Sequence, residues 1–402
     1  PGSRGPRTAE EAEVMTTLGD ITIPKGIQTG PFGSQLHASD YTTFGIGVVM
    51  PQDIGDNSVR YENIARIPDA TAKPLTKHSL QVGDIVFSRR GDVTRRALIR
   101  STDEHLLCGT GCLRVRIDDG VADSRFVSYQ LALPQSKEWL TRHAVGATMA
   151  NLNTTILSSL PLDIPQLDDQ HAIAEVLGAL DEKIAANSRT MLISQQLIMS
   201  MYQSLPTEGG AHLQDITVVR KNKSEPEEIE PNETYIGLEH LTRRSIWANK
   251  TGIGSDATST KSIFHTGDTL FGKLRPYFHK VAIAPTSGVC STDILVLSPT
   301  INELSPLVLA AANDDATVER AVQNSNGTRM PRAKWADIST TPVPNPDATE
   351  TKHFCAKADE LIDLCRSLIV ESRTLAATRD ELLPLLMSGK ITVADAEKRI
   401  AE

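Results

Sequence analysis

The sequence predicts a mixed α/β (α+β) protein in which two globular domains are separated by two long antiparallel coiled-coil helices. Three observations lead to this fold class. The chain has 402 residues, which is more than one hydrophobic core usually supports. The sequence repeats itself once, which predicts an internal pseudo-two-fold repeat. Each copy ends in a run of apolar residues spaced by three and four positions, which is typical of a coiled coil.

The repeat is visible in short motifs. Residues 83–87 (GDIVF) return as residues 267–271 (GDTLF) at an offset of 184, and Cys108 returns as Cys290 at an offset of 182. Around Pro161 and Pro342 the offset is 181. Each GDxxF run predicts a turn followed by a buried strand, with its phenylalanine in the core.

The repeat also sets the expected domain boundaries. Each copy begins with short β-type runs and a few helical stretches, broken by Gly, Pro, Asn and Asp, and ends with a long helix that follows a proline. We expect a disordered tail or cloning remnant over residues 1–12, a first globular domain over 13–165 and a first spacer helix over 166–206. A second globular domain then covers 207–346, and a second spacer helix with a C-terminal tail covers 347–402.

The two helices carry the most regular pattern in the chain. Apolar positions alternate in steps of four and three over four heptads, and the two ladders are related by a constant offset of 181. The predicted seam consists of Ile173, Leu177, Leu180, Ile184, Ile198 and Leu205 in the first helix and Phe354, Leu361, Leu368, Leu375, Leu382 and Leu386 in the second. Asn187, Ser194, Ser372 and Arg379 interrupt it, and polar seam residues tend to fix register. The alternative is two ordinary amphipathic helices, each packed on its own domain.

Composition leaves several classes of protein open. The net charge of -9 argues against a nucleic-acid partner, but basic residues cluster locally, with five arginines between positions 89 and 100. No run of about 18 apolar residues could span a membrane. The five cysteines are odd in number and lie in apolar runs, so we expect buried free thiols and a cytoplasmic protein. Cys108 and Cys112 have no second Cys or His pair nearby, so no metal site is expected.

The sequence gives no support for an intrinsic catalytic site. A DNA methyltransferase should contain an Asn/Asp-Pro-Pro-aromatic motif, but no Pro-Pro dipeptide occurs, and there is no P-loop. Asp347, Glu350 and Lys352 imitate a nuclease signature, but their spacing is too short to span two strands. Carboxylates at a helix N-terminus explain them better. We therefore expect neither catalysis nor a cofactor on this chain.

Four motifs, taken in order and with the duplication, carry a resemblance to a known family. They are residues 30–36 (GPFGSQL), 83–91 (GDIVFSRRG), 267–277 (GDTLFGKLRPY) and 382–391 (LLPLLMSGKI). The chain resembles the specificity subunits of type I restriction-modification systems over nearly its whole length. The second copy departs from the first, because it lacks the Gly-Pro-Phe-Gly loop and has a basic run followed by an acidic run instead.

The resemblance implies a division of labour. Each globular domain would be a target recognition domain that reads one half of a split double-stranded DNA site, and the two half-sites would differ. The helices would set the distance between the halves and dock modification subunits, two in number, which methylate adenine with S-adenosylmethionine. Restriction subunits, which translocate and cleave DNA with ATP and Mg, would join the assembly. This chain would be its non-catalytic subunit.

Exposed basic and amide side chains are the candidates for DNA contact, because Arg and Lys neutralise phosphates and Arg reads guanine edges. The candidates are Lys25, Gln28, Ser34, Arg89, Arg90, Arg95, Arg96 and Asn151 in the first copy and Lys273, Arg275, Tyr277, Arg329, Arg332 and Lys334 in the second. They could instead lie on solvated loops without a ligand. The alternative function is a bivalent coiled-coil scaffold that binds proteins and not DNA.

Overall fold

The structure is a computed structural model, which describes residues 16–32, 35–61, 64–146, 150–207, 210–325 and 330–401. The chain forms two compact units. Unit 1 contains the residues up to Asp181 and those from Ala376 onward, and unit 2 contains Glu182–Leu375. Each unit therefore combines one globular domain with a part of both long helices, whereas the sequence suggested helices separate from the domains.

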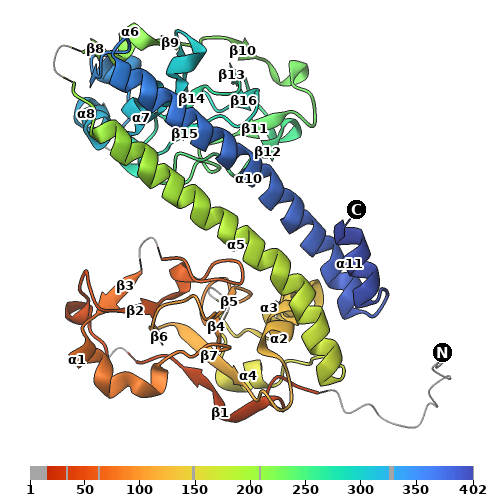
Figure 1. Ribbon diagram of the computed structural model, residues 1–402. Coiled ribbons are helices and arrows are strands. Elements are labelled where there is room, and N and C mark those ends of the chain that lie inside the picture. Colours follow the sequence, from red (N-terminus) through yellow and green to blue (C-terminus); the bar gives the residue numbers. More distant parts are fainter. Residues whose placement is uncertain are drawn as a thin grey trace. The chain divides into compact units, whose positions relative to one another are not determined.

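The domain of unit 1 is built on two small sheets (Figure 1). One sheet has the strand order β1-β7-β4-β5, and the other has the order β3-β2-β6 with β2 and β6 parallel. The strands are β1 (Thr22–Thr29), β2 (Ile46–Val49), β3 (Ala65–Ile67), β4 (Ile85–Ser88), β5 (Arg96–Leu98), β6 (Leu106–Cys108) and β7 (Cys112–Ile117). The short helices are α1 (Asp69–Ala72), α2 (Ser124–Gln130), α3 (Pro134–His143) and α4 (Thr154–Ser158).

The domain of unit 2 repeats this topology. Its two main sheets have the orders β9-β17-β14-β15 and β10-β13-β16-β11-β12, again with one parallel pair, β11 and β16. The second sheet has two strands more than its counterpart in unit 1, and β8 and β18 form a separate two-stranded sheet. The strands are β8 (Ala211–His212), β9 (Thr217–Val219), β10 (Lys223–Ser224), β11 (Thr234–Ile236), β12 (Gly252–Ile253), β13 (Lys261–Phe264), β14 (Thr269–Gly272), β15 (Val281–Ile283), β16 (Gly288–Cys290), β17 (Ile294–Pro299) and β18 (Pro342–Val343). The short helices are α6 (Leu213–Ile216), α7 (Ser305–Asn313), α8 (Asp315–Asn324) and α9 (Trp335–Ile338). The internal repeat therefore extends from sequence to strand order.

The Gly-Asp turns before β4 and β14 show how the repeated motif produces the repeated structure. Gly83 and Gly267 adopt φ values of +88° and +86°, which favour glycine. In each turn the aspartate side chain accepts a 2.8 Å hydrogen bond from the backbone N–H three residues before it. Phe87 and Phe271 follow in the strands and are 0% and 1% exposed. The predicted turn and buried strand are confirmed in both copies.

Two long helices, α5 (Leu167–Gln203) and α10 (Thr349–Met387), pair in antiparallel orientation, and a short helix α11 (Val393–Ala401) follows them (Figure 1). Within unit 2, Asn187 bonds to Ser372, and the rings of Tyr202 and Phe354 lie 6.1 Å apart, so partner numbers fall along α10 as they rise along α5. All predicted seam residues are buried or half-buried, but Leu205 lies beyond the end of α5 at Gln203 and is not part of the helix. The predicted fold class is thus observed.

Asn187, Ser372 and Arg379 of the seam each bond to a side chain of the opposite long helix. The Nδ2 of Asn187 donates to Glu371 Oε2 at 2.7 Å and to Ser372 Oγ at 3.2 Å. In unit 1, Arg379 Nη1 lies 2.7 Å from Asp181 Oδ1. A polar group buried without a partner is costly, so these bonds explain how the seam accommodates the interruptions seen in the sequence.

The long helices also complete the core of unit 2. Ile198 of α5 and Ile362 of α10 belong to one hydrophobic cluster with Val281 of β15 and Leu307 of α7. The helices therefore pair with each other and also pack on the globular domain. The coiled-coil interpretation therefore holds, and the paired helices also complete the core of this domain.

The cysteines are free and buried, as expected from the sequence. Burial raises the pKa of Cys108 and of Cys290 to about 12, so both thiols stay protonated at neutral pH. Among the residues that the structure describes, no helix is long and apolar enough to cross a membrane.

Asp123 caps α2 and provides a test of this fold. Its side chain accepts hydrogen bonds from the N–H groups of Arg125 and Phe126 and pairs with the Arg125 guanidinium at 2.9 Å. Burial raises its pKa, but the bonds from Arg125 and Phe126 outweigh burial, and the pKa lies below its usual value. A carboxylate with a lowered pKa stabilises the fold above its unfolded pKa of about 3.9, and this contribution is lost as the pH falls through the folded value.

We expect Asp123→Ala to lower the free energy of unfolding by about 1 kcal/mol at pH 7. The deficit should shrink below about pH 4, where protonation removes the same interaction from the parent protein. Urea denaturation at several pH values measures both effects, with Asp163→Ala at an exposed loop position as the control. A deficit that persists undiminished in acid would mean that the carboxylate charge is not what stabilises α2.

Candidate nucleic-acid interface

In unit 1 the structure brings together loops that are far apart in the sequence. We call this surface loop cluster 1, formed by residues 30–32, 89–90, 110–111 and 151. Arg90 and Asn151 form an antiparallel bridge, and the N–H of Arg89 donates to the carbonyl of Gly111 at 2.8 Å. Thr110 Oγ1 donates to the carbonyl of Pro31 at 3.0 Å. Three loops that the sequence singled out separately therefore meet at one place.

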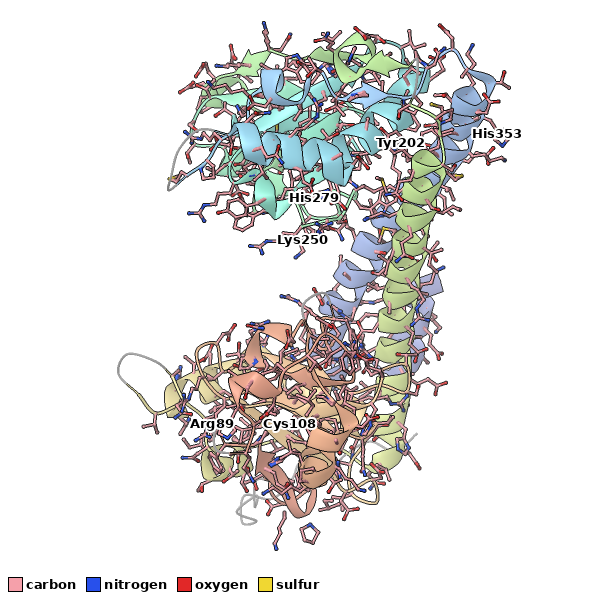
Figure 2. All side chains as sticks on the ribbon, turned by 90° about the vertical axis from the view of Figure 1, so that its left-hand side faces the viewer. Arg89, Cys108, Tyr202, Lys250, His279 and His353 are labelled. Atoms are coloured by element: carbon pink, nitrogen blue, oxygen red, sulfur yellow. The ribbon has the colours of Figure 1, made fainter. Side chains whose placement is uncertain are left out.

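Loop cluster 1 surrounds a hollow of about 440 Å³ whose lining includes Phe32, Arg89 and Arg90. Phe32 is 59% exposed and Arg90 is exposed, whereas Arg89 is half-buried and its Nε donates to the carbonyl of Leu152 at 3.2 Å (Figure 2). The hollow thus offers an exposed aromatic ring and two guanidinium groups. Guanidinium groups bind phosphates and guanine edges, and exposed rings stack on bases.

Unit 2 contains the corresponding loop cluster 2, formed by residues 273–275, 293 and 331–332. Leu274 and Arg332 form an antiparallel bridge, and the N–H of Lys273 donates to the carbonyl of Asp293 at 2.8 Å. These are the same main-chain contacts as in loop cluster 1, at the positions related by the repeat. The two copies therefore present different side chains on one backbone framework.

The side chains of loop cluster 2 are charged and partly paired. Arg332 forms an ion pair with Asp293 at 3.2 Å and remains 57% exposed. Lys273 is half-buried, and burial lowers its pKa. Arg275 is exposed. Arg275 and Arg332 are therefore the predicted residues of this cluster best placed to meet a ligand.

An aromatic turn extends this basic surface. The 3-10 turn Pro276–Phe278 carries Tyr277, which is 52% exposed and packs edge-on against Phe278 at 4.8 Å between ring centroids. The guanidinium of Arg243 lies 3.9 Å above the Phe278 ring, and that of Arg275 lies 5.9 Å from it. Arginine over an aromatic face is a stable cation–π arrangement. A base stacked on Tyr277 would therefore lie beside two positive charges.

The backbone of this turn is strained. Arg275 and His279 have φ values of +52° and +50°, and Arg244, whose N–H donates to the carbonyl of His279, has +55°. Left-handed backbone at a residue with a side chain costs on the order of 1 kcal/mol and persists where the surroundings impose it. Here the N–H of Arg275 donates to the carbonyl of Pro331 at 2.8 Å. The strain lies where the charged side chains gather.

Several predicted residues lie elsewhere. Lys25 is exposed at an irregular point of β1 with φ +60°, and Gln28 is half-buried opposite Arg114, so neither lines the hollow. The half-buried Arg95 donates to the carbonyl of Ile54. Lys334 is exposed before α9, where its N–H donates to the side chain of Asp337. Ser34 and Arg329 lie outside the described residues.

Arg96 corrects the sequence prediction. It is only 4% exposed, and its Nε donates to the carbonyl of Ser128 in α2 at 2.7 Å. Side chains alternate along a strand, so Arg96 in β5 points to the face that α2 covers. It therefore does not belong to an exposed DNA-binding surface.

The sequence analysis also missed residues of this surface. Arg243 stands 32 positions before Arg275 and reaches Phe278 only through the fold. The basic pair Arg243-Arg244 was a usable signal, but no motif marked it. Thr110 carries no signal of its own, because only its hydrogen bond to Pro31 places it in loop cluster 1.

The chain is similar in sequence to known proteins. Residues 70–192 match the family described as type I restriction modification DNA specificity domain. The chain is 22% identical to the MjaX type I restriction enzyme specificity subunit of Methanocaldococcus jannaschii, over 87% of this chain and 88% of that one. It is 26% identical to the type I restriction enzyme EcoDI specificity subunit of Escherichia coli, but this match spans only 33% of the chain and 30% of that relative.

A solved structure supports the fold. The crystal structure of the type I restriction-modification system S subunit from M. genitalium matches with a TM-score of 0.54 and 17% identity, covering 94% of this chain and 97% of that one. The fold is therefore shared at low sequence identity. Together with the sequence matches, this confirms the resemblance to type I specificity subunits found in the sequence.

The strain at Arg275 is testable without a ligand. Glycine is ordinarily less favourable than alanine in folded backbone, but at a left-handed position the order should reverse. We expect Arg275→Gly to be more stable than Arg275→Ala by about 1 kcal/mol in urea denaturation. The control is the same pair of substitutions at Tyr277, which does not have a positive φ. There we expect Tyr277→Ala to be at least as stable as Tyr277→Gly. If alanine is as stable as glycine at position 275, the backbone there is not strained.

Proposed function

We propose that this chain, which carries the DNA specificity domain of type I restriction-modification systems, is the DNA-recognition subunit of such a complex. Loop clusters 1 and 2 would each read one half of a bipartite double-stranded site. The observation that carries the proposal is the duplicated framework: identical main-chain contacts hold different basic and aromatic side chains in the two units. One framework with two sets of side chains suits two different half-sites.

The long helices have a second role in this proposal. Their exposed faces would dock two modification subunits, and restriction subunits would join that assembly. S-adenosylmethionine, ATP and Mg would be bound by those partners. The non-catalytic role of this chain is supported by its relatives, which are specificity subunits. A protein-only scaffold would not require paired basic loops.

A salt titration tests the proposal. With its net charge of -9 the chain should bind duplex DNA weakly alone, and tightly and specifically once its modification subunit is added. The affinity should fall steeply with salt, and removing one phosphate contact should lower the slope of log K against log salt by about 0.9. We therefore expect Arg90→Ala and Arg275→Ala to lower the slope, measured by fluorescence anisotropy.

The control is Arg142→Ala, which removes an exposed arginine of α3 that belongs to neither loop cluster. It should leave affinity and slope unchanged. Binding that is insensitive to salt, or an equal effect of all three variants, would count against DNA recognition by the loop clusters. Absence of DNA binding in the assembled complex would favour the scaffold.

A further inference from the structure

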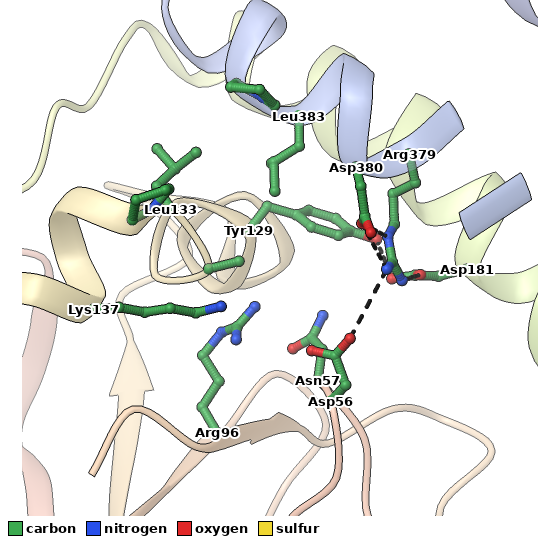
Figure 3. A pocket seen from close by; sticks show the side chains of 13 residues that line it. Asp56, Asn57, Arg96, Tyr129, Leu133, Lys137, Asp181, Arg379, Asp380 and Leu383 are labelled. Atoms are coloured by element: carbon green, nitrogen blue, oxygen red, sulfur yellow. Dashed lines mark hydrogen bonds and ion pairs between the residues drawn. The ribbon is translucent and has the colours of Figure 1, made fainter. Parts of the chain in front are cut away.

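Unit 1 contains a second cavity, away from loop cluster 1, where the globular domain meets both long helices. It has a volume of about 310 Å³. We call its polar lining the charged joint, which consists of Asp56, Asn57, Arg96, Tyr129, Lys137, Asp181, Arg379 and Asp380. Figure 3 shows these side chains converging from the loop at residues 56–57 and from β5, α2, α3, α5 and α10. The DNA-recognition proposal does not use any of them.

Part of the charged joint is internally neutralised. Asp181 Oδ1 pairs with Arg379 at 2.7 Å, and its Oδ2 accepts a 2.7 Å hydrogen bond from the Tyr129 hydroxyl. Arg379 also pairs with Asp380 at 2.7 Å. The carboxylates on the helix side of the cavity are therefore already engaged.

The opposite side holds Asp56, which is 78% exposed and lies 3.9 Å from Arg379, and two buried donor groups with unused N–H groups. Arg96 is 4% exposed, and among the described residues its guanidinium forms no ion pair and donates only through Nε, to Ser128. Asn57 is also 4% exposed, and its Nδ2 has no hydrogen-bond partner among the described atoms. Lys137 lies at the exposed mouth of the cavity. Burial lowers the pKa of Arg96 to about 10, and the charges of Asp56 and Asp181 offset only part of that effect.

The second copy shows that the fold does not need these charges. Arg96 lies opposite Phe87 in its sheet, as Val281 lies opposite Phe271. At the helix offset of 181, four further polar positions also have apolar counterparts. Tyr129, Lys137, Asp181 and Arg379 correspond to Ala310, Val318, Ile362 and Ile198. All five counterparts belong to one hydrophobic cluster and are at most 6% exposed.

This internal comparison separates a structural role from a binding role. Apolar residues often replace buried charges without loss of stability. In unit 2 the corresponding junction of domain and helices is packed with apolar side chains. Unit 1 instead keeps a cavity, a buried cation and an unpaired amide donor. Burying such groups is costly unless an acceptor satisfies them. A ligand would supply the acceptor that the chain itself does not.

We propose that the cavity of the charged joint binds a small molecule that carries an oxyanion, a phosphate or a carboxylate, next to an apolar group. Arg96, Asn57 and Lys137 would donate to the oxyanion. Leu133, Pro134 and Leu383, which also line the cavity, would contact the apolar part. The volume is at the lower end of the range for small-molecule sites, which runs from about 300 Å³ upward.

Isothermal titration of the full chain with phenyl phosphate, benzoate and phenol tests this inference. Phenyl phosphate or benzoate should bind saturably, and whichever binds more tightly identifies the oxyanion. Phenol, which has the ring without the charge, should bind at least about tenfold more weakly, because charge-assisted hydrogen bonds supply most of the affinity. Arg96→Met and Lys137→Met should each weaken binding by about tenfold.

The matched control is Arg142→Met on α3, which removes an exposed charge outside the cavity. It should bind as the parent does. Circular dichroism reports whether Arg96→Met folds, and Lys137→Met decides the question if it does not, since Lys137 is exposed. No saturable binding of either anion, phenol binding as tightly as the anions, or equal binding by Lys137→Met and Arg142→Met would overturn the proposal.

Discussion

The antiparallel pairing of α5 with α10 is the constraint on which the rest of the structure depends. Neither helix can bury its apolar face alone, and in unit 2 the pair also supplies residues such as Ile198 and Ile362 to the core of the domain. The bonds of Asn187 to Glu371 and Ser372 fix which turns of the two helices meet. A coiled-coil seam is periodic, so fixing one pair of contacts fixes the others. The register therefore determines where each helix residue lies in its unit.

The elements that the sequence predicted well are local and periodic. The 4-3 spacing identified both helices and their seam, and the Gly-Asp turns identified β4 and β14, because one residue type at one backbone conformation is enough to specify them. The three loop candidates of the first copy were also found, but only as separate loops. Their meeting depends on hydrogen bonds between distant residues, such as Thr110 with Pro31, which no local pattern encodes.

The errors have the same origin. Arg96 looked like one more member of a basic run, yet the alternation of β5 and the cover of α2 bury it. Arg243 was overlooked because its partner, Phe278, belongs to another loop. Arg379 was noticed only as an interruption of the seam, whereas its partner Asp181 explains why it is tolerated. In each case the sequence pattern did not reveal which other element packs against the residue.

The duplication makes the chain its own control. Where the two copies keep the same main-chain contacts, as in the loop clusters, the backbone holds the framework and the side chains differ between the copies. Where one copy is apolar and the other polar, as at the junction of domain and helices, the difference cannot be required by the fold. Buried polar groups without partners are rare in native structures, so this asymmetry points to use by a ligand.

The central claim is that each domain reads its own half of a DNA site, and one measurement tests it directly. Residues 207–346 are replaced by the matching domain of another specificity subunit, and the chimera is expressed with its modification subunits in cells whose methylated sites are then sequenced. The account predicts a methylated motif in which one half changes and the other half keeps its bases. A motif in which both halves change together, or in which neither changes, would contradict it.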